Sequence, residues 1–221
     1  MYYALIGDMV GSKKLAEDER RSAQAALAAA LDEVNCRHDA HIAAKFLITL
    51  GDECQGLMLP SGDPVCAALT VMHRMRPYPI RFAVGAGDIS TPIRHEAAIG
   101  ADGSAFHNAR RVIESMKARH GARLRFALED NELELRLNTI SALCDKLSLQ
   151  WTDKQELAVY TLLMAKLGGA PMTQAGLAKL LGIGQSTVNE QLKAAGFNEY
   201  CAGIMYVKNT LSSYYGGGSN A

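Results

Sequence analysis

Two carboxylates stand at the ends of apolar stretches that are typical of buried strands. Asp8 closes the run Tyr2-Tyr-Ala-Leu-Ile-Gly-Asp8, and Asp52 follows the run Phe46-Leu-Ile-Thr-Leu-Gly51. A carboxylate beside a packed sheet is costly unless it has a partner, and a hard cation that takes oxygen ligands is a suitable one. The pattern therefore indicates a divalent-metal site in which Asp8 and Asp52 hold Mg²⁺ or Mn²⁺.

The turn after Asp8 supplies groups that suit a phosphate. Gly11 lets the chain turn sharply, so the backbone amides of Gly11, Ser12 and Lys13 can point toward an anion at the start of the next helix. These three residues are candidate ligands of a nucleoside triphosphate. A simpler interpretation stays open, in which Asp8 caps a turn or the following helix and Asp52 occupies an ordinary hairpin turn.

The elements that must position these residues alternate between strands and helices. Apolar periodicity predicts strands over residues 2–10, 41–50, 53–59, 80–89 and 122–128, and helices over residues 14–36, 64–76 and 104–121. Asp63 and Pro64 mark the start of the second helix. The order βαββαβ, plus a further strand, predicts an α/β (α+β) fold, a sandwich of the ferredoxin-like or palm type.

The second half of the chain is expected to be helical. An amphipathic helix over residues 131–150 is followed by another over residues 151–167. Residues 173–193 then show a short helix, a turn at Gly182 and a second helix from Gln185, which is the pattern of a helix-turn-helix. Residues 200–215 form either a small wing or a final helix, and residues 216–221 a flexible tail.

Polar side chains at the start of the second of these short helices suit contacts with double-stranded DNA. They are Gln185, Ser186, Thr187 and Asn189, and Lys193 further along the same helix is a further candidate for DNA contact. Residues 151–221 contain five basic and four acidic side chains, so DNA contact requires a dimer or a locally clustered basic face. The alternative is a module for protein contact or dimerisation.

These patterns divide the chain into four parts. Residues 1–130 are expected to form a nucleotide-binding domain, residues 131–150 a connecting helix, residues 151–215 a small all-α helix-turn-helix domain with a wing as the alternative at its end, and residues 216–221 the tail. The 23 basic and 23 acidic side chains balance, which argues against a strongly charged partner for the whole chain. Five scattered cysteines without CxxC spacing are expected to be reduced core residues.

The sequence also bears on location. No charged-then-apolar leader opens the chain, and no uninterrupted apolar run approaches the length of a membrane span. We therefore expect a cytoplasmic protein without a membrane partner.

Several segments taken together resemble the catalytic domain of class III nucleotidyl cyclases. Asp8-Met-Val-Gly-Ser12 is similar to that family's first metal motif and Leu50-Gly-Asp-Glu53 to its second, while Arg81-Phe-Ala-Val-Gly-Ala-Gly87 and Gly103-Ser-Ala-Phe-His-Asn-Ala-Arg-Arg-Val112 are similar to the strand and helix that follow. The resemblance covers about residues 2–130 and extends more distantly to the diguanylate cyclase palm. A cyclase-like domain joined to a helix-turn-helix resembles the SatD family.

The resemblance implies roles for particular residues. Asp8 and Asp52 would be the metal ligands, Arg111 takes the position of the transition-state arginine, and His107 takes that of an asparagine. In that chemistry the metals activate a 3′-hydroxyl and clamp the triphosphate. The arrangement also implies a head-to-tail homodimer, in which Arg111 completes the metal site of the other subunit.

The base-reading positions depart from the family's pattern. Thr49 replaces the lysine or glutamate that reads a purine, and Gly100 replaces its polar partner, although Asp102 lies nearby. Selection of adenine or guanine by the usual pair is therefore not expected.

Three functions are compatible with the sequence. The first is a metal-dependent nucleotidyl cyclase-type enzyme, a phosphorus–oxygen lyase acting on a nucleoside triphosphate. The alternative is a non-enzymatic DNA-binding transcriptional regulator whose cyclase-like domain senses a nucleotide. A third is a scaffold that uses both halves for protein contacts.

Overall fold

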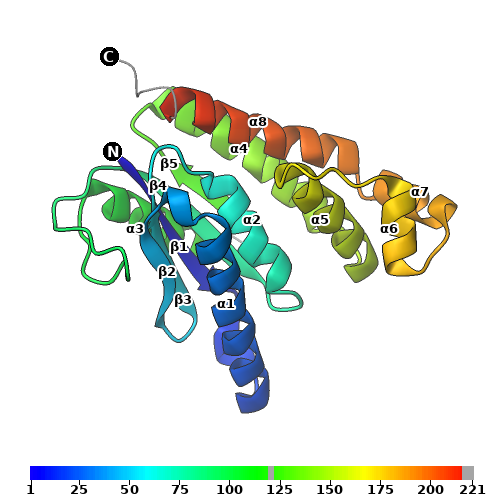
Figure 1. Ribbon diagram of the computed structural model, residues 1–221, viewed down its shortest axis with the longest axis horizontal. Coiled ribbons are helices and arrows are strands. Elements are labelled where there is room, and N and C mark those ends of the chain that lie inside the picture. The colour runs from blue at the N-terminus through cyan, green and yellow to red at the C-terminus, as the bar shows by residue number, and fades with distance from the viewer. Residues whose placement is uncertain (119–121, 216–221) are drawn as a thin grey trace.

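The chain folds into a mixed α/β structure, which confirms the predicted α/β class. A computed structural model describes residues 1–118 and 122–215. Two predicted features, the end of the third helix at residues 120–121 and the tail at residues 216–221, lie outside the described residues. Figure 1 shows a twisted sheet with helices packed against it and a group of C-terminal helices that extends to one side.

The strands β1 to β5 and the helices α1 to α3 follow the predicted order, with small shifts at their ends. The strands are β1 (Tyr2–Met9), β2 (Ile42–Leu50), β3 (Glu53–Met58), β4 (Ile80–Gly87) and β5 (Leu124–Ala127). The helices are α1 (Glu17–Arg37), α2 (Pro64–Arg74), α3 (Ser104–Lys117), α4 (Asn131–Ser148), α5 (Asp153–Leu167), α6 (Gln174–Leu181), α7 (Gln185–Ala194) and α8 (Phe197–Tyr215). Short 3-10 turns cover Ser12–Lys14 and Asp39–His41.

Strand pairing places β1 at the centre of the sheet. The strand order is β2-β3-β1-β4-β5; β1 is antiparallel to both β3 and β4, β2 is antiparallel to β3, and β4 is parallel to β5. Helix α3 makes the connection between the two parallel strands, as a parallel pair requires. The centre of the sheet therefore ends at Asp8 and Met9, next to the β2–β3 turn.

Alternation along β1 assigns its side chains to two faces. Tyr3 and Leu5 belong to the large core cluster that includes α1 and α2. Ala4 and Ile6 belong to a second cluster, which α3 completes on the opposite face. Asp8 continues the series of Ala4 and Ile6, so its carboxylate points to the face that α3 covers.

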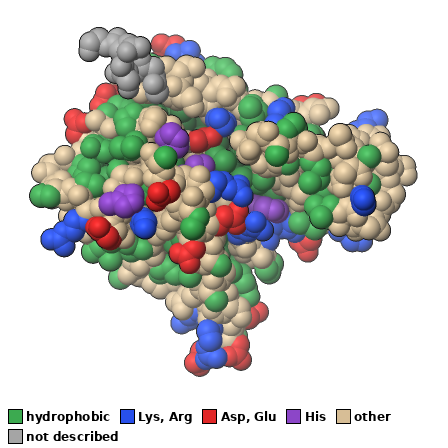
Figure 2. Space-filling model, viewed as in Figure 1, with side chains coloured by type: hydrophobic (Ala, Val, Ile, Leu, Met, Phe, Trp, Pro, Cys, Tyr) green, Lys and Arg blue, Asp and Glu red, His purple; other side chains and the backbone are tan. Residues whose placement is uncertain are grey.

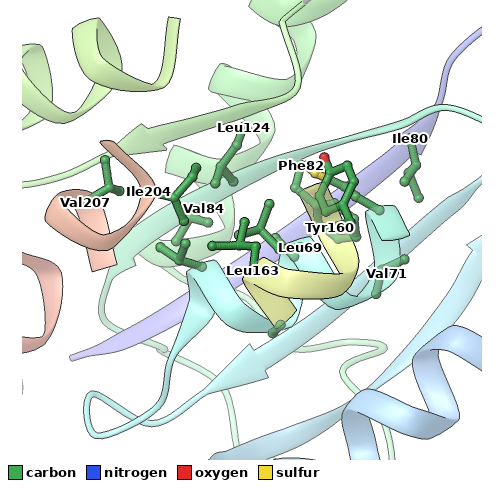
Figure 3. Packing of buried hydrophobic residues seen from close by; sticks show 14 of the residues in the cluster. Leu69, Val71, Ile80, Phe82, Val84, Leu124, Tyr160, Leu163, Ile204 and Val207 are labelled. Atoms are coloured by element: carbon green, nitrogen blue, oxygen red, sulfur yellow. The ribbon is translucent and has the colours of Figure 1, made fainter. Parts of the chain in front are cut away.

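The C-terminal helices share the large core with the sheet. Helix α4 contacts β5 and α8, and α5 contacts α2 on one side and α6 and α7 on the other. In Figure 3, Tyr160 and Leu163 of α5 pack against Leu69 of α2 and Phe82 of β4. One continuous cluster of buried side chains thus joins the two halves of the described chain.

The end of the chain is helical. Of the two alternatives expected for residues 200–215, a wing or a helix, the helix is observed, as part of α8. Within the described residues, no helix is both long enough and apolar enough to cross a membrane.

Helix α3 lies unusually close to β4 because glycine faces it. A Cβ added at Gly85 would collide with the backbone of Ala105 and Ala109. Backbone atoms of a packed helix cannot turn aside as a side chain can. The absence of a side chain at Gly85 therefore fixes the distance between α3 and the sheet.

We expect Gly85→Ala to lower the free energy of unfolding by about 3 kcal/mol, since overpacking against backbone forces α3 to shift. Gly184→Ala is the matched control, because its added Cβ meets no atom closer than 3.6 Å, and its effect should stay within about 0.5 kcal/mol. Urea denaturation followed by circular dichroism measures both. Equal stability of the two variants would contradict the close approach of α3.

Candidate functional site

A small pocket lies beside the turn that follows β1. We call it the turn pocket; it has a volume of about 310 Å³ and lies between the β1–α1 connection, the first turns of α1 and the β2–β3 turn. It is lined by Met9, Ser12, Lys13, Arg20, Gln24, Gly51 and Asp52. The two turns that carry predicted ligands therefore meet at one pocket.

The turn pocket is held in shape by hydrogen bonds between its walls. Gly11 adopts a left-handed conformation with φ of 75°, which allows the sharp turn into the 3-10 segment. Ser12 is buried, and its hydroxyl donates to Asp52 Oδ2 at 2.5 Å. Gln24 of α1 donates to the carbonyl of Gly51 at 3.1 Å. The Asp52 carboxylate is thus fixed toward the turn of Gly11 and Ser12, for which phosphate binding stays a prediction.

The turn pocket collects some predicted residues and adds two that the sequence reasoning missed. Ser12, Lys13 and Asp52 line it, and Gly11 lies in the same turn. Arg20 and Gln24 are new. They stand four residues apart on α1, so their position on one face of the predicted helix was the signal that could have found them.

Asp8 has different partners from Asp52. It is 8% exposed, and its Oδ2 lies 3.0 Å from Arg81 Nε while its Oδ1 lies 3.5 Å from Lys117 Nζ. The backbones of the two segments do meet, since Met9 donates to the carbonyl of Asp52. The two carboxylates nevertheless interact with separate groups. A metal shared by Asp8 and Asp52 stays a prediction.

Glu53 is the second buried carboxylate under α3. It is the cross-strand partner of Asp8 in the β1–β3 ladder, and it is 6% exposed. Arg110 of α3 binds it with both terminal nitrogens, at 2.5 and 2.8 Å, and this hydrogen bonding raises the pKa of Arg110. Arg81 and Arg110 thus approach neighbouring carboxylates on the same face of the sheet.

Lys117 links this cluster to the surface. Its ammonium lies 2.8 Å from Glu114, and that hydrogen bond, with the nearby charge of Asp8, raises the pKa of Lys117. The same contact lowers the pKa of Glu114. We call the set Asp8, Glu53, Arg81, Arg110 and Lys117 the charge cluster. Its three cations neutralise two buried carboxylates, and one of the three also binds an exposed carboxylate.

No cluster of three or more His, Cys, Asp or Glu side chains suitable for a metal occurs within residues 1–118 and 122–215. The turn pocket still offers oxygen donors in Asp52 and Ser12. Mg²⁺ usually binds to a protein through one or two carboxylates together with the phosphates of a substrate. The donor set therefore fits a metal that arrives with a phosphorylated ligand, and it does not form a complete protein cage.

The residues assigned to catalysis by resemblance lie on the exposed side of α3. Arg111 is exposed, and it lines a separate cavity with Arg125 and Glu134. His107 is exposed as well, and its Nε2 lies 2.8 Å from Asp102 Oδ1. Neither Arg111 nor His107 lines the turn pocket.

Thr49 also interacts away from the turn pocket. Its hydroxyl lies 3.3 Å from the carbonyl oxygen of Glu53 and 3.4 Å from the carboxylate of the same residue. The predicted nucleotide-binding residues Thr49 and Asp102 are therefore not brought together with Ser12 and Lys13.

Helices α6 and α7 pack against one another through a small apolar seam. Leu177 and Ala178 of α6 and Val188 and Leu192 of α7 are buried. Thr173 caps α6 by accepting from the amide of Gly176 at 3.0 Å, and Gly182 ends this helix with φ of 66°. The residues predicted to contact DNA are all exposed: Gln185, Ser186, Thr187, Asn189 and Lys193.

Comparison with known protein families identifies the family of this chain. A mixed α/β sheet followed by a helical C-terminal half is the general class that the fold defines. The model of the SatD family matches residues 2–210, so the chain belongs to the SatD family, as its sequence predicted. A comparison with curated proteins finds no match.

The contacts of the charge cluster predict different losses of stability for substitutions at two adjacent arginines. Arg110→Met leaves the Glu53 carboxylate buried without its bidentate partner, so we expect a loss of about 2 kcal/mol in the free energy of unfolding. The loss is smaller than for a fully buried ion pair, because the Arg110 side chain is partly exposed to solvent. Arg111→Met is the matched control and should change stability by less than about 0.5 kcal/mol. Chemical denaturation at neutral pH measures both. Equal losses would show that the Glu53–Arg110 pair has no special role.

Proposed function

We propose that this SatD-family chain binds a nucleoside triphosphate together with Mg²⁺ or Mn²⁺ in the turn pocket, as a protein of the nucleotidyl cyclase-like type. The strand order supports this proposal. The antiparallel order β2-β3-β1-β4, with α1 and α2 as connections, is the order expected of a ferredoxin-like or palm sheet. The turn pocket lies at the end of its central strand.

The observation that carries the proposal is the meeting of a carboxylate, a hydroxyl and two cations at one pocket. Asp52 and Ser12 supply oxygen ligands for a divalent ion. Lys13 and Arg20 supply positive charge for phosphate oxygens. A metal held by Asp52 would supply charge neutralisation for the phosphates. The composition of the pocket thus matches a metal–triphosphate complex.

Binding is supported more directly than turnover. In the two-metal chemistry of cyclases, a carboxylate at the end of the first strand joins the one in the turn. Asp8 occupies that first position, but Arg81 and Lys117 already neutralise it. A second metal would have to exchange with these cations. Nucleotidyl transfer therefore requires a rearrangement of the charge cluster that binding alone does not require.

A homodimer is part of the same proposal. Arg111 is exposed on α3 and does not contact the turn pocket of its own chain. An exposed arginine at this position is available to the metal site of a second subunit, as the head-to-tail arrangement of cyclases would require. The enzyme is therefore proposed to be active only as a dimer.

The second candidate function is a nucleotide-responsive DNA-binding regulator. It is favoured by the exposed polar residues at the start of α7 and by the buried seam between α6 and α7, which together support a helix-turn-helix. On the face of this lobe that Figure 2 shows, charged side chains are scattered and form no dense basic patch. Two copies of α7 in a dimer would double the basic contacts.

Asp52→Asn tests the nucleotide site. Calorimetric titration of each ribonucleoside triphosphate in the presence of Mg²⁺ should show binding to the wild type and at least about tenfold weaker binding to the variant, because a charged ligand of the metal is lost. Asp18→Asn is the control, since the Asp18 side chain is 93% exposed on α1, and it should bind normally. Affinity that is the same in both variants and insensitive to chelation would contradict the proposal.

Product analysis separates binding from turnover in the same samples. Incubation with Mn²⁺, followed by a pyrophosphate assay and mass analysis, identifies a cyclic product if the protein is an enzyme. Release that survives both Asp8→Asn and Asp52→Asn would not come from this site. Tight binding without release would favour the regulator.

The DNA-binding role of α7 predicts a selective loss. A duplex enriched from a random library by the wild-type protein should bind at least about tenfold more weakly to Gln185→Ala/Asn189→Ala, since each base contact contributes on the order of 1–3 kcal/mol. Asn209→Ala/Ser213→Ala, two exposed positions on α8, is the matched control. Fluorescence anisotropy at several salt concentrations measures the affinity. Failure to enrich any duplex, or equal binding by both variants, would contradict the proposal that α7 recognises DNA.

A further inference from the structure

A second cavity, larger than the turn pocket, lies between the sheet and the C-terminal helices. We call it the junction cavity; its volume is about 490 Å³. Its walls come from the β1–α1 connection, the end of α2 and the segment before β4, the end of α3, the segment before β5, and α5. Five basic side chains line it: Lys14, Arg76, Arg81, Lys117 and Arg123.

These cations outnumber the carboxylates that contact them. Arg76 and Arg123 share the single carboxylate of Glu156, at 3.0 and 3.1 Å. Arg81 and Lys117 share Asp8, and Lys117 also reaches the exposed Glu114. The five cations thus face three carboxylates. The junction cavity carries an excess of positive charge that an anion would balance.

Much of this charge is removed from water. The side chains of Arg81, Arg123 and Arg76 are 12%, 19% and 20% exposed. The Nε of Arg76 is buried and lies near Glu156 without a well-formed hydrogen bond among the described residues. Other guanidinium nitrogens are already bound, since Arg76 Nη2 donates to the carbonyl of Asp153 at 2.7 Å and Arg81 Nη1 to that of Met116 at 3.1 Å. Desolvated guanidinium groups are costly without full hydrogen bonding, and their planar forks match the oxygens of a phosphate. The guanidinium groups on the polar side of the cavity are therefore suited to bind the oxygens of a phosphate group.

The remaining wall is apolar. Met72 and Ile80 are buried, Tyr78 is half-buried, and Leu149 is exposed at the rim. A pocket of this volume with an apolar wall and a few converging charged groups is typical of small-molecule sites. Figure 2 shows Lys and Arg side chains gathered with acidic ones over α2, the helix that contacts α5.

We propose that the junction cavity binds a small phosphorylated molecule with an apolar or aromatic body, and that this ligand is an effector distinct from the nucleotide of the turn pocket. The two pockets share no lining residue. They lie on opposite sides of one turn, because Gly11 and Lys14 line the junction cavity whereas Ser12 and Lys13 line the turn pocket. The proposal rests on the lining of its own cavity and is independent of the proposed nucleotide function.

The same geometry gives the effector a route to the C-terminal helices. Glu156 belongs to α5, and its pairs with Arg76 and Arg123 hold α5 against the end of α2 and the segment before β5. A phosphate that binds these arginines competes with Glu156. Occupation of the junction cavity therefore changes how α5, and through it α6 and α7, is attached to the sheet.

Adjacent lysines provide a matched test with 1-naphthyl phosphate as the probe. Calorimetric titration should show binding to the wild type that weakens with salt, and 1-naphthol should bind at least about tenfold more weakly, since it lacks the charge. Lys14→Gln should weaken the binding of 1-naphthyl phosphate by about three- to tenfold, and Lys13→Gln should leave it unchanged, because only Lys14 faces the cavity. Both lysines are exposed, so both variants should fold.

Four results would overturn the proposal: no binding of 1-naphthyl phosphate to the wild type, equal binding of 1-naphthol, no greater weakening by Lys14→Gln than by Lys13→Gln, or loss of binding in Asp52→Asn. Asp52→Asn keeps this test separate from that of the nucleotide site. Retention of 1-naphthyl phosphate binding in that variant, with or without binding of a nucleotide–Mg²⁺ complex by the wild type, would support an independent junction cavity. Loss of 1-naphthyl phosphate binding in Asp52→Asn would assign the probe to the turn pocket and also overturn the proposal.

Discussion

Two buried carboxylates under one helix are the constraint on which this structure depends. Asp8 and Glu53 face each other across β1 and β3, and both point to the side of the sheet that α3 covers. Burial of two unpaired negative charges would strongly destabilise the fold. Cations from β4 and α3 pair with them, so the position of α3 is set by ion pairs at one end and by close contact with Gly85 further along.

This arrangement separates residues that the sequence patterns had assigned to one site. The charge cluster occupies the α3 side of the sheet edge, and the turn pocket gathers Asp52, Ser12, Lys13 and Arg20 beside the start of α1. The junction cavity lies on the other side of the same turn and reaches α5. Ligands in the two pockets would both contact the short segment of residues 11–14, which lines the turn pocket on one side and the junction cavity on the other. Since α5 shares the large core with the sheet, changes there have a packed route to α6 and α7.

Much of the fold could be predicted because the relevant signals are local. Asp63 caps α2 and Pro64 begins it, as predicted, because both act within one helical turn. The strands were visible as short apolar runs between glycines and turn residues. The contacts of Arg110 with Glu53 and of Arg81 with Asp8 could not be predicted in this way, because they join positions 57 and 73 residues apart. Arg111 was selected by resemblance, whereas its neighbour Arg110 makes the buried contact.

The sequence by itself determined the order of strands and helices, the α/β class, the membership of the SatD family and the turn at Gly11. These depend on side-chain period, on backbone preference and on short motifs, which act over a few residues. Only the tertiary structure decided which carboxylate faces which pocket. The alternation of β1 sends Asp8 toward α3, while the β2–β3 turn directs Asp52 to Ser12, because neighbouring backbones can present their side chains to opposite sides of a sheet.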